Sequence, residues 1–490
     1  MDVTVLVFLS SGLFLGWSLG ANDAANIFGT AVGSRMVKFT TAAIVGSIFV
    51  VLGATISGGG AAHTLGKLGA VNAMGGAFTA AFAAALTVYW MTKAKLPVST
   101  SQAIVGAIVG WNLFAGARTE LNTLTTIMLT WVLCPVLAAI TAAVLFKVTS
   151  RLLHWAQWHL LTLDTITRNA LIVAGAFGAY SLGANNIANV MGVFVPSSPF
   201  ADIEFVGITL TGVQQLFLLG AIAIAVGIFT YSKRVMMTVG RSLMPLTPVA
   251  AWVVVMSHSL VLFLFASEGL EYLLASNGLP TVPLVPVSSS QAVVGAVIGI
   301  GLLKGGTQIN WTVAGRIASG WIITPIIATA VCVLALFFVQ NLFLQTVSKP
   351  IEYEVGTSVI ERLHEEKFPV QRLQQLEGEL FSSAAELSRR LNEINNLTSE
   401  QKERVLDLAR VLILHVEIDR LNADLSSALS PTQLSALNKL DGQEFEYQWQ
   451  LEESLARLEP EWRLLEDITL NKHHNKEIQS RLALIEEAFK

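Results

Sequence analysis

The chain has 490 residues, of which 53% are hydrophobic and only 13% are charged. Soluble domains carry about a quarter charged residues, so this composition excludes an ordinary soluble protein over most of the chain. The charges are also unevenly spread: residues 1–345 hold 8 acids and 14 bases, whereas residues 346–490 hold 27 acids and 17 bases. We therefore expect an apolar membrane region followed by a polar C-terminal domain.

Ten apolar segments are each long enough to cross a lipid bilayer, which takes about 20 residues. They are 4–31, 40–60, 71–91, 97–117, 123–146, 167–193, 207–230, 248–272, 285–303 and 317–341. Basic residues such as Lys38, Lys147 and Lys233 fall in every second loop, and acidic loops lie on the other side. Because basic loops favour the cytoplasmic side, both termini are expected outside the cytoplasm, with five crossings in each half.

Three motifs occur twice, in the same order. Gly20–Asn26 recurs as Gly183–Asn189, Pro97–Ala107 recurs as Pro286–Ala296, and Trp131 with Pro135 recurs as Trp321 with Pro325. Five crossings per half is an odd number, so the two halves have opposite orientations. We interpret this duplication as two inverted-topology repeats with broken or re-entrant helices, an architecture typical of secondary transporters.

The chain is thus expected to divide into a first membrane repeat at 1–148 and a second at 167–345. Between them, 149–166 contains Trp155, Trp158 and two histidines. These residues predict a cytoplasmic interfacial helix over Leu152–Leu163.

The polar segment 346–490 shows apolar residues at helical spacing. The two stripes are Ala384, Leu387, Leu391 and Ile394, and Val411, Leu414, Ile418, Leu421 and Leu425. Such stripes predict amphipathic helices. Ser430 followed by Pro431 predicts the start of another helix. We expect a soluble helical bundle or coiled-coil domain.

Asp23 is the only acid deep within a predicted span. A carboxylate in a membrane is costly unless it is paired or solvated, so it usually marks an ion pathway. The plainer alternative is a carboxylate hydrogen-bonded to a neighbouring helix. Gly20, Asn22 and Asn26 surround Asp23, and this composition favours an unwound, ion-coordinating segment. The ion is Na⁺ or a proton, and Asp23 is the expected Na⁺ ligand.

The second copy of this motif carries Asn186 in place of the acid, next to Asn185. An amide supplies an oxygen ligand but no charge and no titrating proton, so we expect two unequal cation sites built from Asp23, Asn22, Asn185 and Asn186. The alternative is that both copies are helix-packing faces made of small residues.

The two Pro-Val-Ser segments each start an apolar stretch with a proline and three hydroxyl groups. Free N–H groups, a positive helix end and hydroxyls together form an anion cradle. Two cradles from opposed repeats are expected to enclose a tetrahedral oxyanion, and ordinary helix capping is the alternative. His63 and His258 are interpreted as packed, hydrogen-bonded histidines and not as a proton relay.

The sequence resembles the duplicated signature of the inorganic phosphate transporter (PiT) family over about residues 5–345. The segments that carry the resemblance are Gly20–Asn26, Gly183–Asn189 and the two Pro-Val-Ser segments. The resemblance implies phosphate uptake coupled to Na⁺ or H⁺, with sulfate carriers as a smaller branch, and commonly a homodimer. Carried over by position, the residues expected to contribute to cation and anion binding are Asp23, Asn26, Asn186 and Asn189, and of these Asn26 and Asn189 are expected to bind phosphate. The expected anion-site residues are Ser99, Thr100, Ser101, Gln102, Ser288, Ser289, Ser290 and Gln291. Asn186 departs from the usual aspartate of the family, and both glutamines stand where histidine is common.

The sequence therefore predicts an all-α, multi-pass protein of the plasma (inner) membrane that carries out secondary active symport of phosphate. The alternatives are a sulfate or other oxyanion permease, a passive anion channel, or a membrane-anchored sensor whose functional part is the tail. We expect no enzymatic activity, no cofactor beyond the coupling Na⁺ or H⁺, and no nucleic-acid partner. The expected partners are phosphate, the coupling ion, the lipid bilayer and a second copy of the chain.

Overall fold

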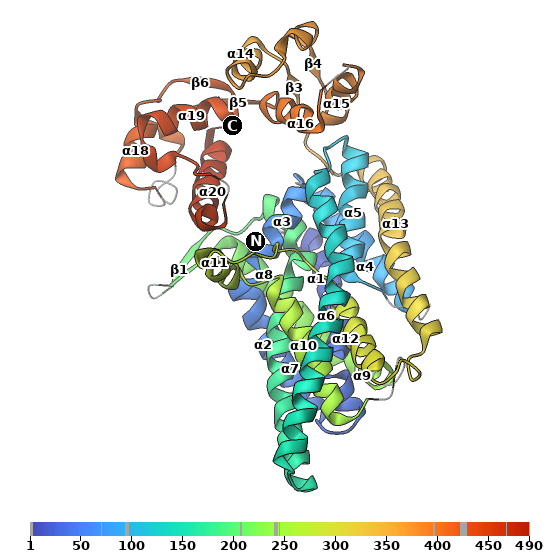
Figure 1. Ribbon diagram of the computed structural model, residues 1–490. Coiled ribbons are helices and arrows are strands. Elements are labelled where there is room, and N and C mark those ends of the chain that lie inside the picture. The colour runs from blue at the N-terminus through green and yellow to red at the C-terminus, as the bar shows by residue number, and fades with distance from the viewer. Residues whose placement is uncertain are drawn as a thin grey trace. The chain divides into compact units, whose positions relative to one another are not determined.

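The computed structural model (Figure 1) describes residues 3–69, 71–93, 98–205, 208–239, 244, 246–394, 397–421, 429–466 and 468–489. The chain forms two compact units. The first contains Met1–Ala115, Thr119–Glu271 and Thr281–Lys349, and the second contains Gly116–Arg118, Tyr272–Pro280 and Pro350–Lys490.

The membrane region is built from long apolar helices. They are α1 (Val3–Gly33), α2 (Phe39–Ser57), α3 (Gly59–Leu68), α4 (Met74–Lys93), α5 (Thr100–Ala115), α6 (Leu121–Ala156), α7 (Leu160–Met191), α8 (Gly212–Thr230), α9 (Ser232–Val239), α10 (Pro248–Leu264), α11 (Glu268–Ser276), α12 (Ser289–Leu303) and α13 (Trp311–Asn341). A 3₁₀ turn, η1 (Gly192–Ser197), follows α7, and β1 (Ile203–Phe205) pairs antiparallel with β2 (Ile208–Leu210).

Seven of the described helices are long and apolar enough to cross a membrane: α1, α2, α4, α6, α7, α8 and α13. The predicted span 248–272 is a pair of helices, α10 and α11, with a bend of 71° between them. The predicted spans 97–117 and 285–303 correspond only to α5 and α12, with 16 and 15 residues. Both are shorter than the prediction because non-helical chain precedes them, including Val98 and Ser99 before α5.

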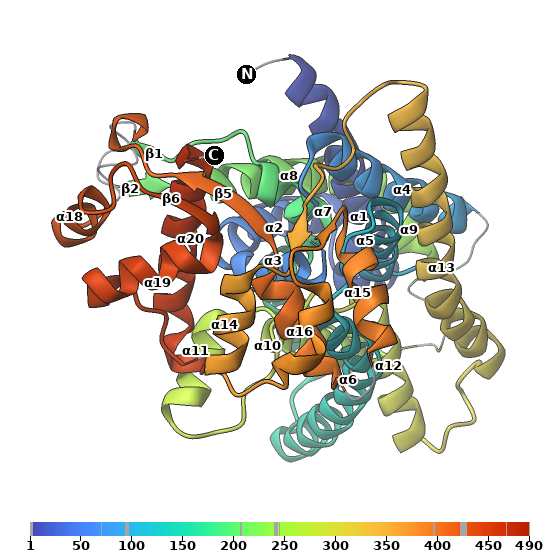
Figure 2. The same cartoon turned by 90° about the horizontal axis from the view of Figure 1, so that it is seen from above.

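Helices of the first half pack on helices of the second half in a matching way. α2 packs against α7 and α8 packs against α1, while α13 packs against α5 and α12 packs against α6. Figure 2 shows α13 beside α4 and α5, and α12 beside α6. At the last two interfaces, Gly106 faces the backbone of Pro325 and Gly295 faces the backbone of Pro135, with no room for a β-carbon. Glycine at these two positions therefore allows the helix backbones to touch.

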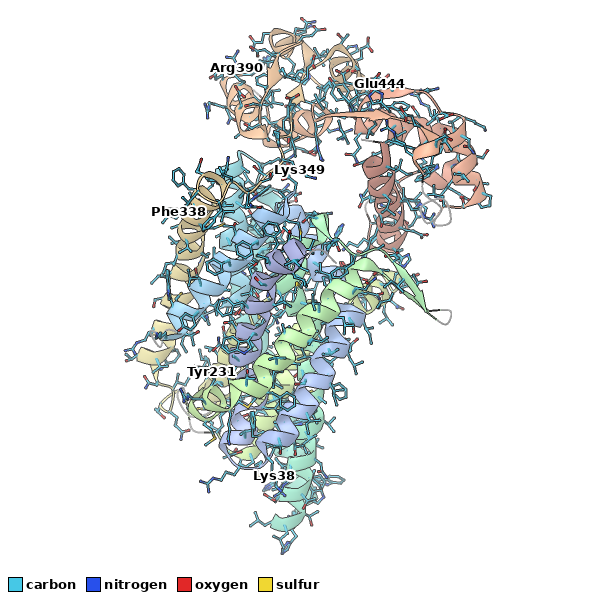
Figure 3. The ribbon with its side chains drawn as sticks, turned by 180° about the vertical axis from the view of Figure 1, so that it is seen from behind. Lys38, Tyr231, Phe338, Lys349, Arg390 and Glu444 are labelled. Carbon is cyan, nitrogen blue, oxygen red and sulfur yellow. The ribbon has the colours of Figure 1, made fainter. Side chains whose placement is uncertain are left out.

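The surface of the first unit is apolar along its helices. Large side chains such as Phe338 on α13 are exposed (Figure 3), as expected of a face that contacts lipid. Lys38, before α2, and Lys349, after α13, lie at opposite ends of this unit.

The predicted interfacial helix over Leu152–Leu163 is wrong. The helix α6 continues through this region to Ala156, and α7 begins at Leu160. The chain reverses at Gln157, whose backbone is left-handed with φ of 45°. The aromatic and histidine residues that suggested a helix lying on the membrane are instead at the ends of two long helices.

The second unit mixes helices and short strands. Its elements are β3 (Tyr353–Glu354), α14 (Thr357–Glu365), η2 (Val370–Arg372), η3 (Gln374–Leu376), β4 (Leu380–Phe381), α15 (Ala384–Glu393), α16 (Ser399–Leu408), β5 (Val411–His415), η4 (Ile418–Arg420), α18 (Pro431–Asn438), β6 (Glu444–Tyr447), α19 (Gln448–Leu458), η5 (Pro460–Trp462), η6 (Thr469–Asn471) and α20 (Lys472–Phe489). β3 pairs antiparallel with β4, and β5 with β6.

The prediction of an all-helical or coiled-coil tail is therefore wrong in part. The stripe at 384–394 forms α15 with Leu387 and Leu391 buried, as predicted. The second stripe instead begins with strand β5, because Val411–Leu414 is a continuous apolar run that fits a buried strand as well as a helix. Leu425 of this stripe lies outside the described residues. Two separate hydrophobic cores, one around Leu387 and one around Leu437, replace a coiled-coil seam.

Candidate anion and cation site

The starts of α5 and α12 are capped by serines. Ser99 Oγ accepts a hydrogen bond from the Gln102 backbone N–H at 3.4 Å, and Ser288 Oγ accepts one from the Gln291 backbone N–H at 3.4 Å. The capping interpretation is therefore correct for these two serines. It leaves Thr100, Ser101, Ser289 and Ser290 for other contacts. Pro97, which opens the first motif, lies outside the described residues.

The two helix starts meet and bond to each other. Ser101 Oγ donates to the Val287 carbonyl at 3.1 Å, and Ser290 Oγ donates to the Val98 carbonyl at 3.4 Å. Each hydroxyl thus bonds the backbone carbonyl of a non-helical residue that precedes the opposite helix. These two bonds join residues 186 and 192 positions apart in the chain, and they bring two positive helix ends together.

An asparagine from each half reaches a hydroxyl of the other half. Asn26 Nδ2 on α1 donates to Ser289 Oγ at 3.0 Å, and Asn189 Nδ2 on α7 donates to Ser101 Oγ at 2.8 Å. Ser289 Oγ also lies 2.9 Å from His258 Nε2 on α10. The structure therefore brings the repeated amide motif and the hydroxyl motif together.

The predicted unwinding of the Gly20–Asn26 and Gly183–Asn189 motifs is wrong. Both lie inside continuous helices, α1 and α7. Their amides are satisfied without unwinding, because Asn22 Nδ2 donates to the Ser18 carbonyl at 3.1 Å and Asn186 Nδ2 donates to the Leu182 carbonyl at 3.2 Å. The glycines serve close packing, since Gly20 contacts the backbone of Ile224.

The acid and its counterpart amide differ in bonding. Asp23 is buried, with 7% of its surface exposed, and no hydrogen bond or ion pair from the described residues reaches its carboxylate. Asn186 Oδ1 instead accepts a hydrogen bond from Asn189 Nδ2 at 2.9 Å. Asn185 is engaged with backbone: it donates to the Val285 carbonyl and accepts from the Val287 N–H.

Several buried oxygens lack a hydrogen-bond partner in the described structure, namely Gln102 Oε1, Gln291 Oε1 and Asn189 Oδ1. Amide and carboxylate oxygens are the ligands that hard cations take. A cluster of three or more His, Cys, Asp or Glu side chains, as a transition metal prefers, is absent from the described residues. These unpartnered amide oxygens have the chemistry that hard cations take.

The sequence interpretation of His258 as a packed, hydrogen-bonded histidine is confirmed, but its place beside the anion motif was missed. His258 is fully buried, and its Nε2 atom lies 2.9 Å from Ser289 Oγ. The signal was present, because an ionisable side chain inside an apolar span is by default a functional residue. Its partner was not predictable, since Ser289 lies on another helix.

The sequence profile described as "Phosphate transporter family" matches residues 19–332 and 274–412 of the chain. The chain belongs to the phosphate transporter family. It is thus a multi-pass membrane transporter, and the family resemblance predicted from the motifs is confirmed.

Relatives of this transporter are named as candidate phosphate permeases. One from Methanocaldococcus jannaschii is 28% identical over 329 residues, which is 67% of this chain and 95% of that protein. Another, from Haemophilus influenzae, is 25% identical and covers 68% of this chain and 96% of that protein. A solved structure described as "The sodium-dependent phosphate transporter" shares the fold, with a TM-score of 0.55 at 23% identity, covering 69% of this chain and 99% of that chain.

Proposed function

We propose that this transporter is a phosphate symporter of the plasma membrane that is driven by a cation gradient. The observation that carries the proposal is the meeting of the α5 and α12 starts, where Asn26 and Asn189 reach hydroxyls from the opposite half. Helix N-termini with free N–H groups and hydroxyls suit a tetrahedral oxyanion. The Thr100 hydroxyl, without a hydrogen bond among the described residues, adds a further donor.

Asp23 is the proposed binding residue for the cation. Asp23 and Asn26 are three residues apart on α1 and so share one helix face. An ionised Asp23 repels phosphate that is seated beside Asn26. A cation at Asp23 removes this repulsion, so cation and phosphate favour each other's binding by the same factor. Phosphate uptake is then coupled to the cation gradient.

Na⁺ is the proposed cation, and H⁺ is the alternative. The buried oxygens of Asn189, Gln102 and Gln291 have no described partner. Amide oxygens can ligate a metal ion but do not titrate, so they are of use to Na⁺ and of none to a transported proton. The other predicted site residues remain part of the proposal because they belong to the same two duplicated motifs.

We also propose two inverted repeats, both termini outside the cytoplasm, and a homodimer. The matching packing of α2 on α7 and α8 on α1 supports two inverted repeats. The basic residues Lys38, Lys147 and Lys233, which fall in every second loop, support a cytoplasmic end near Lys38 and both termini outside. A homodimer is proposed from the family resemblance, and the mass of the purified protein in detergent tests it.

Equilibrium binding of labelled phosphate to the purified transporter, with and without Na⁺, tests the site. We expect Na⁺ to tighten phosphate binding and phosphate to tighten Na⁺ binding by an equal factor. Choline in place of Na⁺ is the control. Binding that ignores Na⁺ contradicts the coupling, and stronger displacement by sulfate than by unlabelled phosphate favours the sulfate permease.

A further inference from the structure

His258 is fully buried on α10, with 0% exposure, and its Nε2 atom lies 2.9 Å from Ser289 Oγ. We propose that His258 is a positioning residue for the anion site. Its Nε2–H group bonds the Ser289 oxygen and so directs the Ser289 hydroxyl hydrogen onto the bound oxyanion. This inference rests on the proposed function, because it assigns a role within the same site.

The bonding capacity of the Ser289 hydroxyl leads to this role. A serine hydroxyl has one hydrogen to donate and two lone pairs to accept with. Asn26 Nδ2 occupies one lone pair at 3.0 Å. When His258 Nε2–H occupies the other, the hydrogen of Ser289 has no acceptor among the described residues. A charged oxygen of the substrate supplies that acceptor.

The second nitrogen of His258, Nδ1, is buried and has no hydrogen-bond partner in the described structure. A proton on Nδ1 leaves that N–H group unpaired, whereas a proton on Nε2 leaves the Ser289 hydroxyl hydrogen unpaired, so without substrate each tautomer has one buried donor that lacks a partner. A bound oxyanion accepts the Ser289 hydrogen and so pairs the donors of the Nε2–H tautomer alone. The proton is therefore placed on Nε2 when phosphate is bound.

The equivalent hydroxyls of the first half lack this arrangement. Ser101 Oγ accepts from Asn189 but donates its own hydrogen to the Val287 carbonyl at 3.1 Å. Thr100, which occupies the same place in its motif as Ser289, has no hydrogen bond among the described residues. Ser289 is thus the motif hydroxyl that two side chains hold in place, and the histidine makes it a fixed donor.

The test is equilibrium binding of labelled inorganic phosphate to the full-length protein in saturating Na⁺. We expect His258→Leu to raise the phosphate Kd by about tenfold to a hundredfold, the loss of one hydrogen bond to a charged group. His258→Gln carries an amide N–H that reaches Ser289 and should recover most of the loss. Ser257→Ala is the matched control, because it removes the hydroxyl of the preceding residue, which has no hydrogen-bond partner among the described residues.

A double-mutant cycle shows whether His258 acts through Ser289. Ser289→Ala should weaken phosphate binding, and adding His258→Leu to it should cost nothing more. Wild-type affinity in His258→Leu, or full additivity of the two changes, overturns the inference. If Ser289→Ala itself binds phosphate normally, the anion site has failed instead.

The tautomer is read directly, and without activity, by nitrogen NMR of protein labelled at histidine. The His258 signals are assigned by their loss in His258→Gln. A protonated Nε2 in the presence of phosphate is expected, and an unprotonated Nε2 contradicts the proposal. This measurement also decides the question if His258→Leu fails to fold.

Discussion

The two halves of the membrane unit share one frame but differ in charge. Asp23 in α1 is buried without a described partner, whereas Asn186 at the equivalent place in α7 bonds Asn189 and the Leu182 carbonyl. The Asn186 side chain finds hydrogen-bond partners within its own helix, whereas the Asp23 carboxylate has none among the described residues. Under the proposed function, the first half holds the one buried acid of the described site that a cation would neutralise, while both halves supply hydroxyl groups for the anion.

The halves also differ in how their hydroxyls are used. Ser101 of α5 donates its hydroxyl hydrogen to the Val287 carbonyl, whereas the hydroxyl of Ser289 in α12 is hydrogen-bonded to Asn26 and His258. Charge thus lies on the first-half motif, while the hydroxyl that two side chains hold, Ser289, lies on the second-half helix. Asn26 shares a helix face with Asp23 and bonds Ser289, so under the proposed function coupling and anion binding meet at Asn26.

The largest expected effect comes from removing the one-sided charge. Asp23→Asn makes the halves alike, so cation binding no longer relieves any repulsion. We expect gradient-driven phosphate uptake to fall by about a hundredfold, at the upper end of common coupling free energies. Uptake into proteoliposomes under a Na⁺ gradient measures it.

The matched control is Asp164→Asn, which removes an exposed carboxylate that pairs with Arg168 near the start of α7. Its uptake should equal that of the wild type. If Asp23→Asn accumulates phosphate at the wild-type rate, the carboxylate has no part in coupling. The difference in charge between Asp23 and Asn186 then has no functional consequence.

A second carboxylate should sharpen the difference. Asn186→Asp keeps the acceptor for Asn189 but adds a charge near the anion. We expect phosphate affinity at low Na⁺ to fall about tenfold, which corresponds to about 1.4 kcal/mol. High Na⁺ should restore it, with a steeper dependence on Na⁺ concentration. An unchanged Na⁺ dependence of phosphate binding shows that the two positions are not equivalent.

The shared frame itself is tested by Gly106→Ala and Gly295→Ala. Each adds a β-carbon against a proline-bearing backbone of the other half, at Pro325 and Pro135. Because the two contacts match, both changes should destabilise the protein by similar amounts, about 1–3 kcal/mol. Thermal melting in detergent measures this, and Gly66→Ala, with open space around it, should melt as the wild type does. A large effect in only one variant contradicts matched halves.

The smallest expected effect lies in the second unit. Arg404 Nε donates to Glu366 Oε2 at 2.9 Å, and this hydrogen bond lowers the pKa of Glu366. A lowered folded-state pKa stabilises the fold above the unfolded pKa of about 4.3, and the gain is lost as the pH falls through the folded value. Glu366→Gln should cost at most about 1 kcal/mol at pH 7 and nothing in acid. Phosphate uptake at pH 7 should stay unchanged, which keeps the comparison of the halves separate from the tail.

Local patterns in the sequence predicted what depends on neighbours in the chain. The duplicated motifs located the candidate site, the stripe through Leu387 located α15, and Ser430 was found as the cap of α18. The resemblance carried by the motifs identified the family. These features follow from spacing along one helix or from one turn, which a single sequence contains.

Contacts between distant segments were not predictable. Asn185 bonds the backbone of Val285, a hundred residues away, so its cation role could not be weighed against a structural one. The continuous course of α1 through Gly20–Asn26 depends on bonds to its own carbonyls and on close packing of α8. The strand at Val411 depends on pairing with Tyr447. In each case the deciding partner lies elsewhere in the fold.

The most direct test of the central claim is uptake of labelled phosphate into proteoliposomes that contain the full-length transporter. A Na⁺ gradient and a pH gradient are imposed separately, at equal membrane potential and with sulfate as a competitor. We expect accumulation above equilibrium with the inward Na⁺ gradient alone, resistant to sulfate. Equilibration that ignores both gradients contradicts the account and indicates a passive channel, and accumulation with the pH gradient alone replaces Na⁺ by a proton.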